Sequence, residues 1–232
     1  MKEKMKKRVV VLSGAGISAE SGIETFRDSN GLWANHRIED VCTPEALVRD
    51  PERVLNFYNM RREQLLKVEP NAAHLALAHL EQHFIVDIVT QNIDDLHERA
   101  GSTQVHHLHG ELLKSRSLKN PSVIVETREP VRLGDLAPDG GQLRPHIVFF
   151  GEDVPELENG ANIVSLADIL IVVGTSLAVY PAAGLVNYAP SNATCFIVDP
   201  SDVKPSYREF EHIKKKASVG IPELCSLLIS NI

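Results

Sequence analysis

A glycine-rich turn near the start of the chain has the residue types that bind a phosphate group. The apolar run Val9–Leu12 is too short for a helix and predicts a buried strand. It leads into Gly14, Ala15 and Gly16, where the lack of large side chains lets backbone N–H groups approach a diphosphate. With Ala19 the turn matches the loose G-x-G-x-x-G/A pattern of dinucleotide-binding proteins, which a plain glycine turn also satisfies.

The residues after this turn differ from those of a hydride-transfer Rossmann domain. In such a domain an uninterrupted helix would follow. Here Ser21 and Gly22 break the pattern at once, and residues 26–31 have the composition of a loop. We interpret this loop, which carries Phe26 and Arg27, as a flap over a bound cofactor, and a Rossmann oxidoreductase becomes the second interpretation.

Polar side chains follow a second apolar run, Phe84–Thr90. Gln91, Asn92 and Asp94 place amide and carboxylate groups directly after it. Such residues form turns by bonding their own backbone, or they bind a ligand, and the residue types alone leave both possibilities open. His109 ends a His-Leu-His-Gly segment, and an imidazole that titrates near neutral pH suits a general base.

The elements that must position these groups are strands that alternate with helices. Helical patterns cover Ala72–His83 and Ala182–Tyr188. The apolar, β-branched runs are Val9–Leu12, Phe84–Thr90, Ile147–Phe150, Ile169–Val173 and Cys195–Val198. This order predicts an α/β fold with an open, mostly parallel, Rossmann-like sheet covered on both faces. The loops after its strands meet at one edge, so the polar groups on them can converge on one cleft.

Two stretches do not fit the sheet and predict a small inserted module. Glu39–Glu69 is helical, with Pro51 in a first helical turn after a capping Asp50. Ser115–Leu143 is rich in loops. We therefore expect residues 8–30, 70–110 and 144–232 to form the Rossmann-like domain, and residues 31–69 and 111–143 to form the module.

The composition is that of an ordinary soluble globular protein. The chain has 232 residues, of which 43% are hydrophobic and 24% charged. Its net charge of −7 argues against nucleic-acid binding. No window is long enough to span a membrane, no signal peptide is recognisable, and three cysteines are too few for a disulfide framework. We expect a cytoplasmic monomer.

Five motifs follow one another along the chain, namely Gly14–Arg27, Thr90–His97, His107–Gly110, Arg144–Glu152 and Gly174–Leu177. In this order they resemble the motifs of the sirtuins, the NAD-dependent protein-lysine deacylases. The resemblance implies that the chain uses NAD to remove acyl groups from lysine in protein substrates, giving nicotinamide, O-acyl-ADP-ribose and free lysine. A sensor that binds NAD or ADP-ribose without catalysis remains an alternative.

The resemblance also assigns the roles of individual residues. His109 would be the general base, Asn92 would position a water or a ribose hydroxyl, Asp94 would hold the nicotinamide carboxamide, and Gln91 would contact the ribose. The other expected NAD contacts are Gly14, Ala15, Gly16, Phe26, Arg27, Ile93, Gly174, Thr175, Ser176, Asp199 and Ala217. His106 and His107 are expected to be structural.

The zinc site of most sirtuins is missing. Those proteins carry two Cys-x-x-Cys pairs in the small module, whereas residues 111–143 contain no cysteine and no histidine. Structural zinc needs four thiolate or imidazole ligands. We therefore predict no zinc and expect apolar packing to hold the module, through Val123, Ile124, Val125, Leu133 and Leu136.

A helix in the first insertion carries the evidence on the acyl group. Tyr58 and Arg61 are three residues apart and therefore face the same way. They match the Tyr-x-x-Arg pair with which bacterial CobB-like sirtuins grip a succinyl or malonyl carboxylate. Arg62 is expected to extend its charged end to water. Cys42 stands where those relatives usually have alanine, and its added volume should disfavour longer chains such as glutaryl.

The substrate peptide is expected to bind beside the acyl pocket. Val148 and Phe150 would line the tunnel for the acyl-lysine. The peptide backbone would add as an extended strand between the loops that follow Gly151 and Gly174.

Overall fold

The computed structural model describes residues 6–25, 37–203 and 209–232. Its main sheet has six strands in the order β3-β2-β1-β7-β8-β9, and all neighbouring strands are parallel. The strands are β1 (Arg8–Ser13), β2 (Ile85–Thr90), β3 (Val105–His107), β7 (Ile169–Val173), β8 (Thr194–Val198) and β9 (Glu211–Ile213). The predicted α/β fold with a parallel, Rossmann-like sheet is confirmed.

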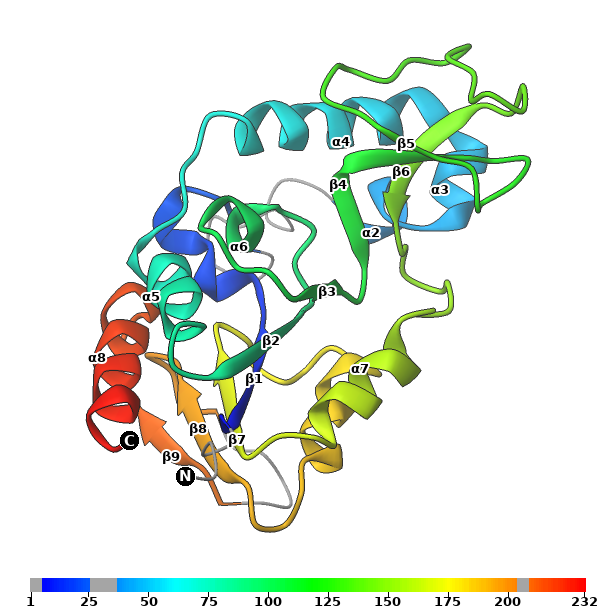
Figure 1. Cartoon of the computed structure of the whole chain (residues 1–232). Coiled ribbons are helices and arrows are strands. Elements are labelled where there is room, and N and C mark those ends of the chain that lie inside the picture. The colour runs from blue at the N-terminus through cyan, green and yellow to red at the C-terminus, as the bar shows by residue number, and fades with distance from the viewer. Residues whose placement is uncertain (1–5, 26–36, 204–208) are drawn as a thin grey trace.

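Helices cover both faces of this sheet (Figure 1). On one face α5 (Ala72–Leu80) and α8 (Ala217–Ser230) bury the side chains of Val9 and Val11. On the other, α7 (Leu157–Val164) and the 3₁₀ helix η3 (Ala182–Tyr188) bury those of Val10 and Leu12. Successive side chains of a strand point to opposite faces, so a strand covered on both faces must be apolar throughout.

A second group of elements lies beyond the edge where β1, β2 and β7 end (Figure 1). Its helices are α2 (Ile38–Val41), α3 (Pro44–Arg49) and α4 (Pro51–Leu65), and its antiparallel sheet has the order β5-β4-β6. These strands are β4 (Gly110–Ser117), β5 (Ile124–Glu126) and β6 (Leu143–Ile147). Asp50 caps α4 by accepting a hydrogen bond from the N–H of Arg53, as the sequence predicts.

The prediction that Ile147–Phe150 is a strand of the parallel sheet was wrong. The strand is β6, which ends at Ile147 and pairs with β4 in the small sheet. Ile147 and Phe149 are apolar because they pack against α4, in a core separate from those of the parallel sheet. A short apolar run indicates burial, but it does not reveal which partner strand buries it.

The predicted packing of the small module was also wrong. Three of the five residues expected to hold it are exposed, with 44%, 54% and 61% of their surface accessible for Ile124, Leu133 and Leu136. Apolar packing against α4 comes from other residues, among them Leu112, Leu113 and Ile147, and polar groups add to it. The Asn59 amide donates to the carbonyl of Val131 at 2.8 Å and accepts from its N–H at 2.9 Å.

Arg62 is a further correction, because its charged end does not reach water. The side chain is 1% exposed, and it donates to the carbonyl of Leu112 at 3.1 Å and to the side-chain oxygen of Asn59 at 2.8 Å. A guanidinium has five N–H donors, so one buried arginine can join a helix to two other segments. Arg62 therefore ties α4 to β4.

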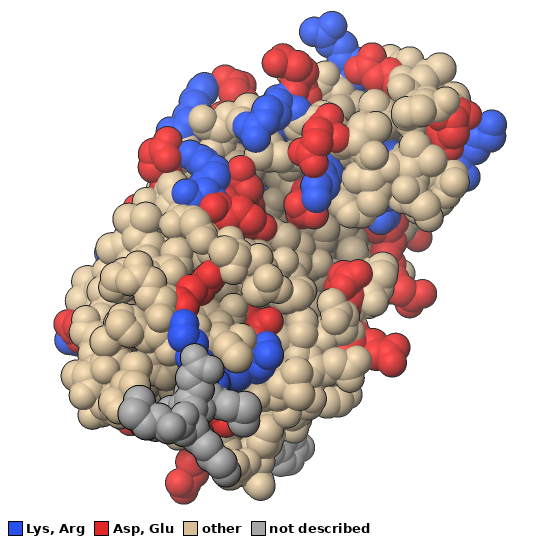
Figure 2. All heavy atoms as spheres, viewed as in Figure 1, with Lys and Arg blue, Asp and Glu red and all other residues tan. Residues whose placement is uncertain are grey.

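The described residues were also predicted to hold no zinc and to contain no membrane span. Within the described ranges, no group of three or more His, Cys, Asp or Glu side chains is placed to hold a metal ion. No described helix is long and apolar enough to cross a membrane. Figure 2 shows acidic and basic side chains interspersed over the small module.

Candidate active site

The glycine turn packs directly against the loop that follows β7. The N–H of Gly14 donates to the carbonyl of Val173 at 3.0 Å, and that of Gly16 donates to the carbonyl of Gly174 at 2.8 Å. A Cβ on Gly16 would lie 2.7 Å from the Cα of Gly174. The glycines are therefore needed for contact between two backbone segments, because β1 and β7 are neighbours and their loops touch.

This contact corrects the expected use of the two N–H groups. Both Gly14 and Gly16 donate within the chain, and neither N–H is reserved for a diphosphate. The turn then forms two short 3₁₀ helices, η1 (Ala15–Ile17) and η2 (Ala19–Ser21), and Gly22 has a φ of 96°. The predicted interruption of the helix is confirmed. Phe26 and Arg27 lie outside the described residues.

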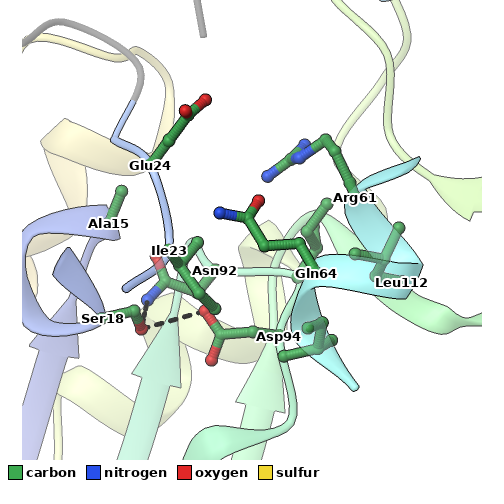
Figure 3. Close-up of a pocket in the computed structure, with 11 residues that line it drawn as sticks. Ala15, Ser18, Ile23, Glu24, Arg61, Gln64, Asn92, Asp94 and Leu112 are labelled. Atoms are coloured by element: carbon green, nitrogen blue, oxygen red, sulfur yellow. Dashed lines mark hydrogen bonds between the residues drawn. The ribbon is translucent and has the colours of Figure 1, made fainter. Parts of the chain in front are cut away.

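The loop after β2 brings Asn92 and Asp94 to the glycine turn (Figure 3). Both side chains are 6% exposed. The Asn92 amide donates to the carbonyl of Gly14 and to the hydroxyl oxygen of Ser18, each at 3.2 Å, and the Ser18 hydroxyl donates to the Asp94 carboxylate at 3.0 Å. Ser18 thus joins the two residues, a role that the sequence analysis did not assign to it.

The buried carboxylate of Asp94 is affected both by its burial and by its hydrogen bonds. Burial raises the pKa of Asp94, while the hydrogen bonds from the Leu96 N–H and the Ser18 hydroxyl act in the opposite direction. Each carboxylate oxygen has two lone pairs, so both oxygens can accept a further donor. An amide N–H of a ligand would meet a ready acceptor here.

His109 follows β3 and has one ring nitrogen fixed. Its Nδ1 lies 3.1 Å from the carbonyl of Gln91. A carbonyl only accepts, so Nδ1 carries the proton and Nε2 has a lone pair. Burial lowers the pKa of His109, which keeps the imidazole neutral at pH 7. This is the protonation state that a general base requires.

The neighbouring His107 is held differently. Nδ1 lies 2.8 Å from the carbonyl of Asn92, and Nε2 lies 2.7 Å from the carboxylate of Glu98. Burial would lower the pKa of His107, but the hydrogen bond and charge of Glu98 raise it. Both nitrogens face acceptors, which agrees with the structural role expected for this residue.

A hollow open to solvent joins the glycine turn, the Asn92 loop and α4. Its lining combines carboxylates, amides, a hydroxyl and a guanidinium with apolar groups (Figure 3). The lining residues are Ala15, Ser18, Ile23, Glu24, Arg61, Gln64, Leu65, Asn92, Ile93, Asp94 and Leu112. Of the predicted site residues, Ala15, Asn92, Ile93, Asp94 and Arg61 meet here. Glu24 and Gln64 had no motif to identify them.

Arg61 and Tyr58 lie on the buried side of α4. Arg61 is 8% exposed, and its guanidinium carbon lies 5.8 Å from the centre of the Phe57 ring. Burial lowers the pKa of Arg61, an effect opposed by Tyr58, Cys42 and Asp94. Tyr58 is 1% exposed and donates a hydrogen bond from its hydroxyl to the sulfur of Cys42 at 3.0 Å.

The segment after β6 runs between His109 and Cys42. The N–H of Val148 donates to the carbonyl of His109 at 2.9 Å, and that of Phe150 donates to the carbonyl of Cys42 at 3.0 Å. Val148 is half-buried and Phe150 is 44% exposed. The two residues expected to line the acyl-lysine tunnel therefore lie beside the expected base and the expected pocket wall.

Glu152 and Arg144 form a charged cluster that holds the segment after β6 in place. The carboxylate of Glu152 accepts from the N–H of Phe149 at 2.7 Å and from the guanidinium of Arg144 at 2.6 Å. Arg144 also lies 3.9 Å from the centre of the Phe149 ring. Charge-assisted bonds of this kind are strong and directional, so residues 148–151 have a defined path.

The other predicted cofactor residues lie outside the lining of the hollow. The Gln91 amide donates to the Thr175 hydroxyl at 3.3 Å, beside Gly174 and Ser176. Asp199 follows β8, and one of its carboxylate oxygens accepts from the N–H of Ser201 at 2.8 Å. Ala217 begins α8 and is 5% exposed in the core.

Known proteins resemble this chain over most of its length. The model of the Sir2 family matches residues 14–181. A NAD-dependent protein deacylase of Bacteroides thetaiotaomicron is 53% identical, covering 96% of this chain and 98% of that protein. One of Aggregatibacter actinomycetemcomitans is 59% identical, covering 85% and 95%.

Solved structures agree in fold. A Sir2 homologue in complex with ADP-ribose has a TM-score of 0.90 and 36% identity, covering 97% of this chain and 93% of that one. A Sir2 homologue in complex with NAD has a TM-score of 0.87 and 37% identity, covering 97% and 91%. The chain belongs to the Sir2 family, the sirtuins.

Proposed function

We propose that this sirtuin uses NAD to remove acyl groups from lysine residues of proteins, and that malonyl and succinyl groups are among them beside acetyl. The observation that carries the proposal is the fixed His109 imidazole, whose Nδ1–H donates to the carbonyl of Gln91 and whose Nε2 has a lone pair. Through the carbonyl of Gln91, this base contacts the loop that carries Asn92 and Asp94. A protein that only sensed NAD would have no need of it.

The chemistry of the hollow fits the nicotinamide and ribose part of NAD. A carboxamide offers both donors and an acceptor, and ribose hydroxyls do the same. The hollow meets them with the carboxylate of Asp94, the amide of Asn92 and the hydroxyl of Ser18. The glycine turn and the Gly174–Ser176 loop would border the diphosphate and the adenosine, together with Asp199 and Ala217, through groups other than the Gly14 and Gly16 N–H.

NAD, when bound, supplies a ribose carbon activated by its nicotinamide leaving group. Asp94 would orient the carboxamide, Asn92 would hold a ribose hydroxyl or a water, and Gln91 would contact the ribose. His109 would accept a proton from a ribose hydroxyl at Nε2. Nicotinamide, O-acyl-ADP-ribose and free lysine are the products.

Arg61 and Tyr58 would bind the carboxylate of an acidic acyl group. A guanidinium matches a carboxylate with two parallel hydrogen bonds, and Arg61 borders the hollow beside Asp94. Cys42 would form the wall of this pocket. Val148 and Phe150 would line the acyl-lysine tunnel, with the substrate backbone extended between the loops after Gly151 and Gly174.

Mass spectrometry of one peptide carrying acetyl, malonyl or succinyl lysine tests the proposal. We expect NAD-dependent loss of each acyl group together with release of nicotinamide. A change in absorbance of the reduced cofactor would indicate the oxidoreductase instead. NAD binding without turnover of any of the three peptides would indicate the non-catalytic sensor.

The remaining proposals concern the setting of the enzyme. We propose a cytoplasmic monomer without nucleic-acid or membrane partners, on the grounds of its composition and its net charge of −7. We propose a division into a Rossmann-like domain (8–30, 70–110 and 144–232) and a zinc-free module (31–69 and 111–143), with the one change that β6 belongs to the module because it pairs with β4. Size-exclusion chromatography with light scattering tests the oligomeric state.

A further inference from the structure

Four buried polar side chains lie next to the loop that carries Asn92, and the proposed mechanism gives them no part. They are Ser13 at the end of β1, Thr90 at the end of β2, His74 in α5 and His97 in α6 (Leu96–Arg99). Ser13, His74 and Thr90 are 0% exposed, and His97 is 1% exposed. Burying polar groups costs free energy unless they are hydrogen-bonded.

Both ends of the Asn92 loop are joined to Ser13. At the start of the loop, Thr90 Oγ1 accepts from the N–H of Asn92 at 3.0 Å and from the Ser13 hydroxyl at 2.8 Å. At its far end, His97 Nε2 lies 3.0 Å from Ser13 Oγ. Residues 91–96 are therefore closed into a loop whose two ends converge on one serine of β1.

The protonation of His74 is fixed by its contact with the backbone. His74 Nδ1 accepts from the N–H of Asn71 at 3.3 Å, as part of the capping box of α5. A neutral imidazole then carries its proton on Nε2. That N–H is buried and has no partner among the described residues.

The ring of His97, which adjoins that of His74, also has a nitrogen without a partner in the part of the chain that the structure describes. His97 Nδ1 is also buried without a described partner. The two rings are in contact, with centroids 4.9 Å apart and an interplanar angle of 67°. With the His97 proton on Nε2, Nδ1 is an acceptor that matches the donor of His74. With the proton on Nδ1, two unpaired donors would meet on contacting rings, at the cost of both desolvation penalties.

We propose that His74, His97, Ser13 and Thr90 form one directed hydrogen-bond chain that positions the Asn92 loop for the reaction with NAD. His74 Nε2–H donates to His97 Nδ1 after a small rotation of the ring, His97 Nε2–H donates to Ser13 Oγ, and the Ser13 hydroxyl donates to Thr90. These are positioning residues, and the inference about catalysis rests on the proposed function.

The hydrogen-bond chain also links the glycine turn to the Asn92 loop, the two parts of the proposed cofactor site. Asn71, whose N–H fixes His74, donates from its side-chain amide to the carbonyl of Ile17 at 2.8 Å and to the hydroxyl of Ser21 at 3.0 Å. The α5 cap is thereby bonded to the glycine turn. The glycine turn and the Asn92 loop are thus connected through buried groups as well as through Ser18.

Burial keeps both imidazoles neutral. It lowers the pKa of His74 to about 4 and that of His97 well below its ordinary value. Glu98 acts in the opposite direction on His74, and His74 and then His107 lower the pKa of His97 further. A neutral imidazole can donate from one nitrogen and accept at the other, as the chain requires.

Nitrogen-15 NMR of the full chain at pH 7.5 tests the direction of the chain without any turnover. We expect His74 and His97 to be neutral with the proton on Nε2, the signals being assigned with His74→Gln and His97→Gln. An Nδ1–H tautomer of His97, or an imidazolium at either position, overturns the proposal. Because no substrate is present, this result does not depend on the proposed function.

A matched pair of variants at Thr90 tests the effect on the reaction. Thr90→Val keeps the shape and removes the hydroxyl, whereas Thr90→Ser keeps the hydroxyl. We expect Thr90→Val to lower kcat/KM for NAD about tenfold, and Thr90→Ser to stay close to the parent. Ser13→Ala serves if Thr90→Val does not fold, with the same expected loss.

The outcomes separate positioning from mere stability. If Thr90→Val lowers the melting temperature but leaves kcat and KM of the folded protein unchanged, the network is only structural and the positioning role is wrong. If the parent binds NAD by calorimetry but deacylates no peptide, the proposed function fails. The NMR result and the effect of Thr90→Val on NAD affinity then still decide the present inference.

Discussion

The hydroxyl of Tyr58 donates a hydrogen bond to the sulfur of Cys42, with 3.0 Å between the two atoms. The same cysteine accepts a bond at its carbonyl from Phe150, in the proposed substrate segment. Cys42 therefore orients the phenol of the proposed acyl pocket and links that pocket to the tunnel.

We predict that Cys42→Ala shifts acyl preference toward longer chains. The variant removes the volume of the sulfur and releases the Tyr58 hydroxyl, so the ratio of deglutarylation to demalonylation should rise about tenfold. Rates on matched peptides measure this ratio. Cys225→Ala, which changes a buried cysteine of α8, is the control and should leave it unchanged. An unaltered ratio in Cys42→Ala would show that the sulfur does not limit the pocket.

We predict that Arg61→Met impairs desuccinylation far more than deacetylation. Methionine keeps most of the apolar packing and removes the charge. Losing a charge-assisted hydrogen bond costs about 1.5–3 kcal/mol, which corresponds to roughly a ten- to hundredfold loss of kcat/KM. Arg53→Met, at a site on the same helix that is 51% exposed, is the control. Equal losses for both acyl groups in Arg61→Met would make Arg61 a packing residue.

His109→Ala should abolish deacylation while NAD binding persists, because the imidazole acts as a base and the cofactor contacts lie elsewhere. Calorimetry measures the binding, and nicotinamide release measures the turnover. The exposed His79→Ala should behave like the parent. Retained O-acyl-ADP-ribose formation in His109→Ala would refute the assignment.

The pH profile of the parent enzyme should depend on the titration of His109. Burial lowers the pKa of His109 below its ordinary value, so the neutral base persists as the pH falls below about 6.5. The acid limb of kcat/KM should therefore lie below pH 6.5, and activity should be lost only as the pH falls through the lowered pKa. An acid limb at or above pH 6.5 would contradict this environment.

Gly16→Ala should destabilise the fold. The added Cβ would lie 2.7 Å from the Cα of Gly174, a backbone atom that cannot move aside as the end of a flexible side chain can. Overpacking of this kind costs about 1–3 kcal/mol, measurable by urea unfolding. Gly184→Ala is the matched control, because no atom lies within 4 Å of its added Cβ. Equal stability of the two variants would show that the turn adapts.

The purified protein should contain no stoichiometric zinc and should keep its activity in a strong chelator. Residues 111–143 offer no cysteine or histidine as ligands, and Asn59 and Arg62 hold the module through hydrogen bonds. Elemental analysis provides the test. One tightly bound zinc per chain would overturn the prediction.

The sequence by itself determined the class of fold and the order of the motifs. Strands such as β1 and β7 are apolar throughout, and only burial on both faces explains such a run. Gly14, Asn92 and Gly174 could be predicted to meet because loops at the carboxyl ends of parallel strands share one edge. Local composition and spacing were enough for these conclusions.

Only the tertiary structure decided which partner each polar or apolar group takes. Ile147 and Phe149 are apolar in either sheet, and Arg62 could have reached water or two carbonyls. The glycine N–H groups were free to bind a ligand until β7 came to lie beside β1. The proton of His97 depends on contacts with Ser13 and His74, which are more than twenty residues away in the sequence. Burial can be inferred from local pattern, but hydrogen-bond direction depends on which groups the folded chain brings together.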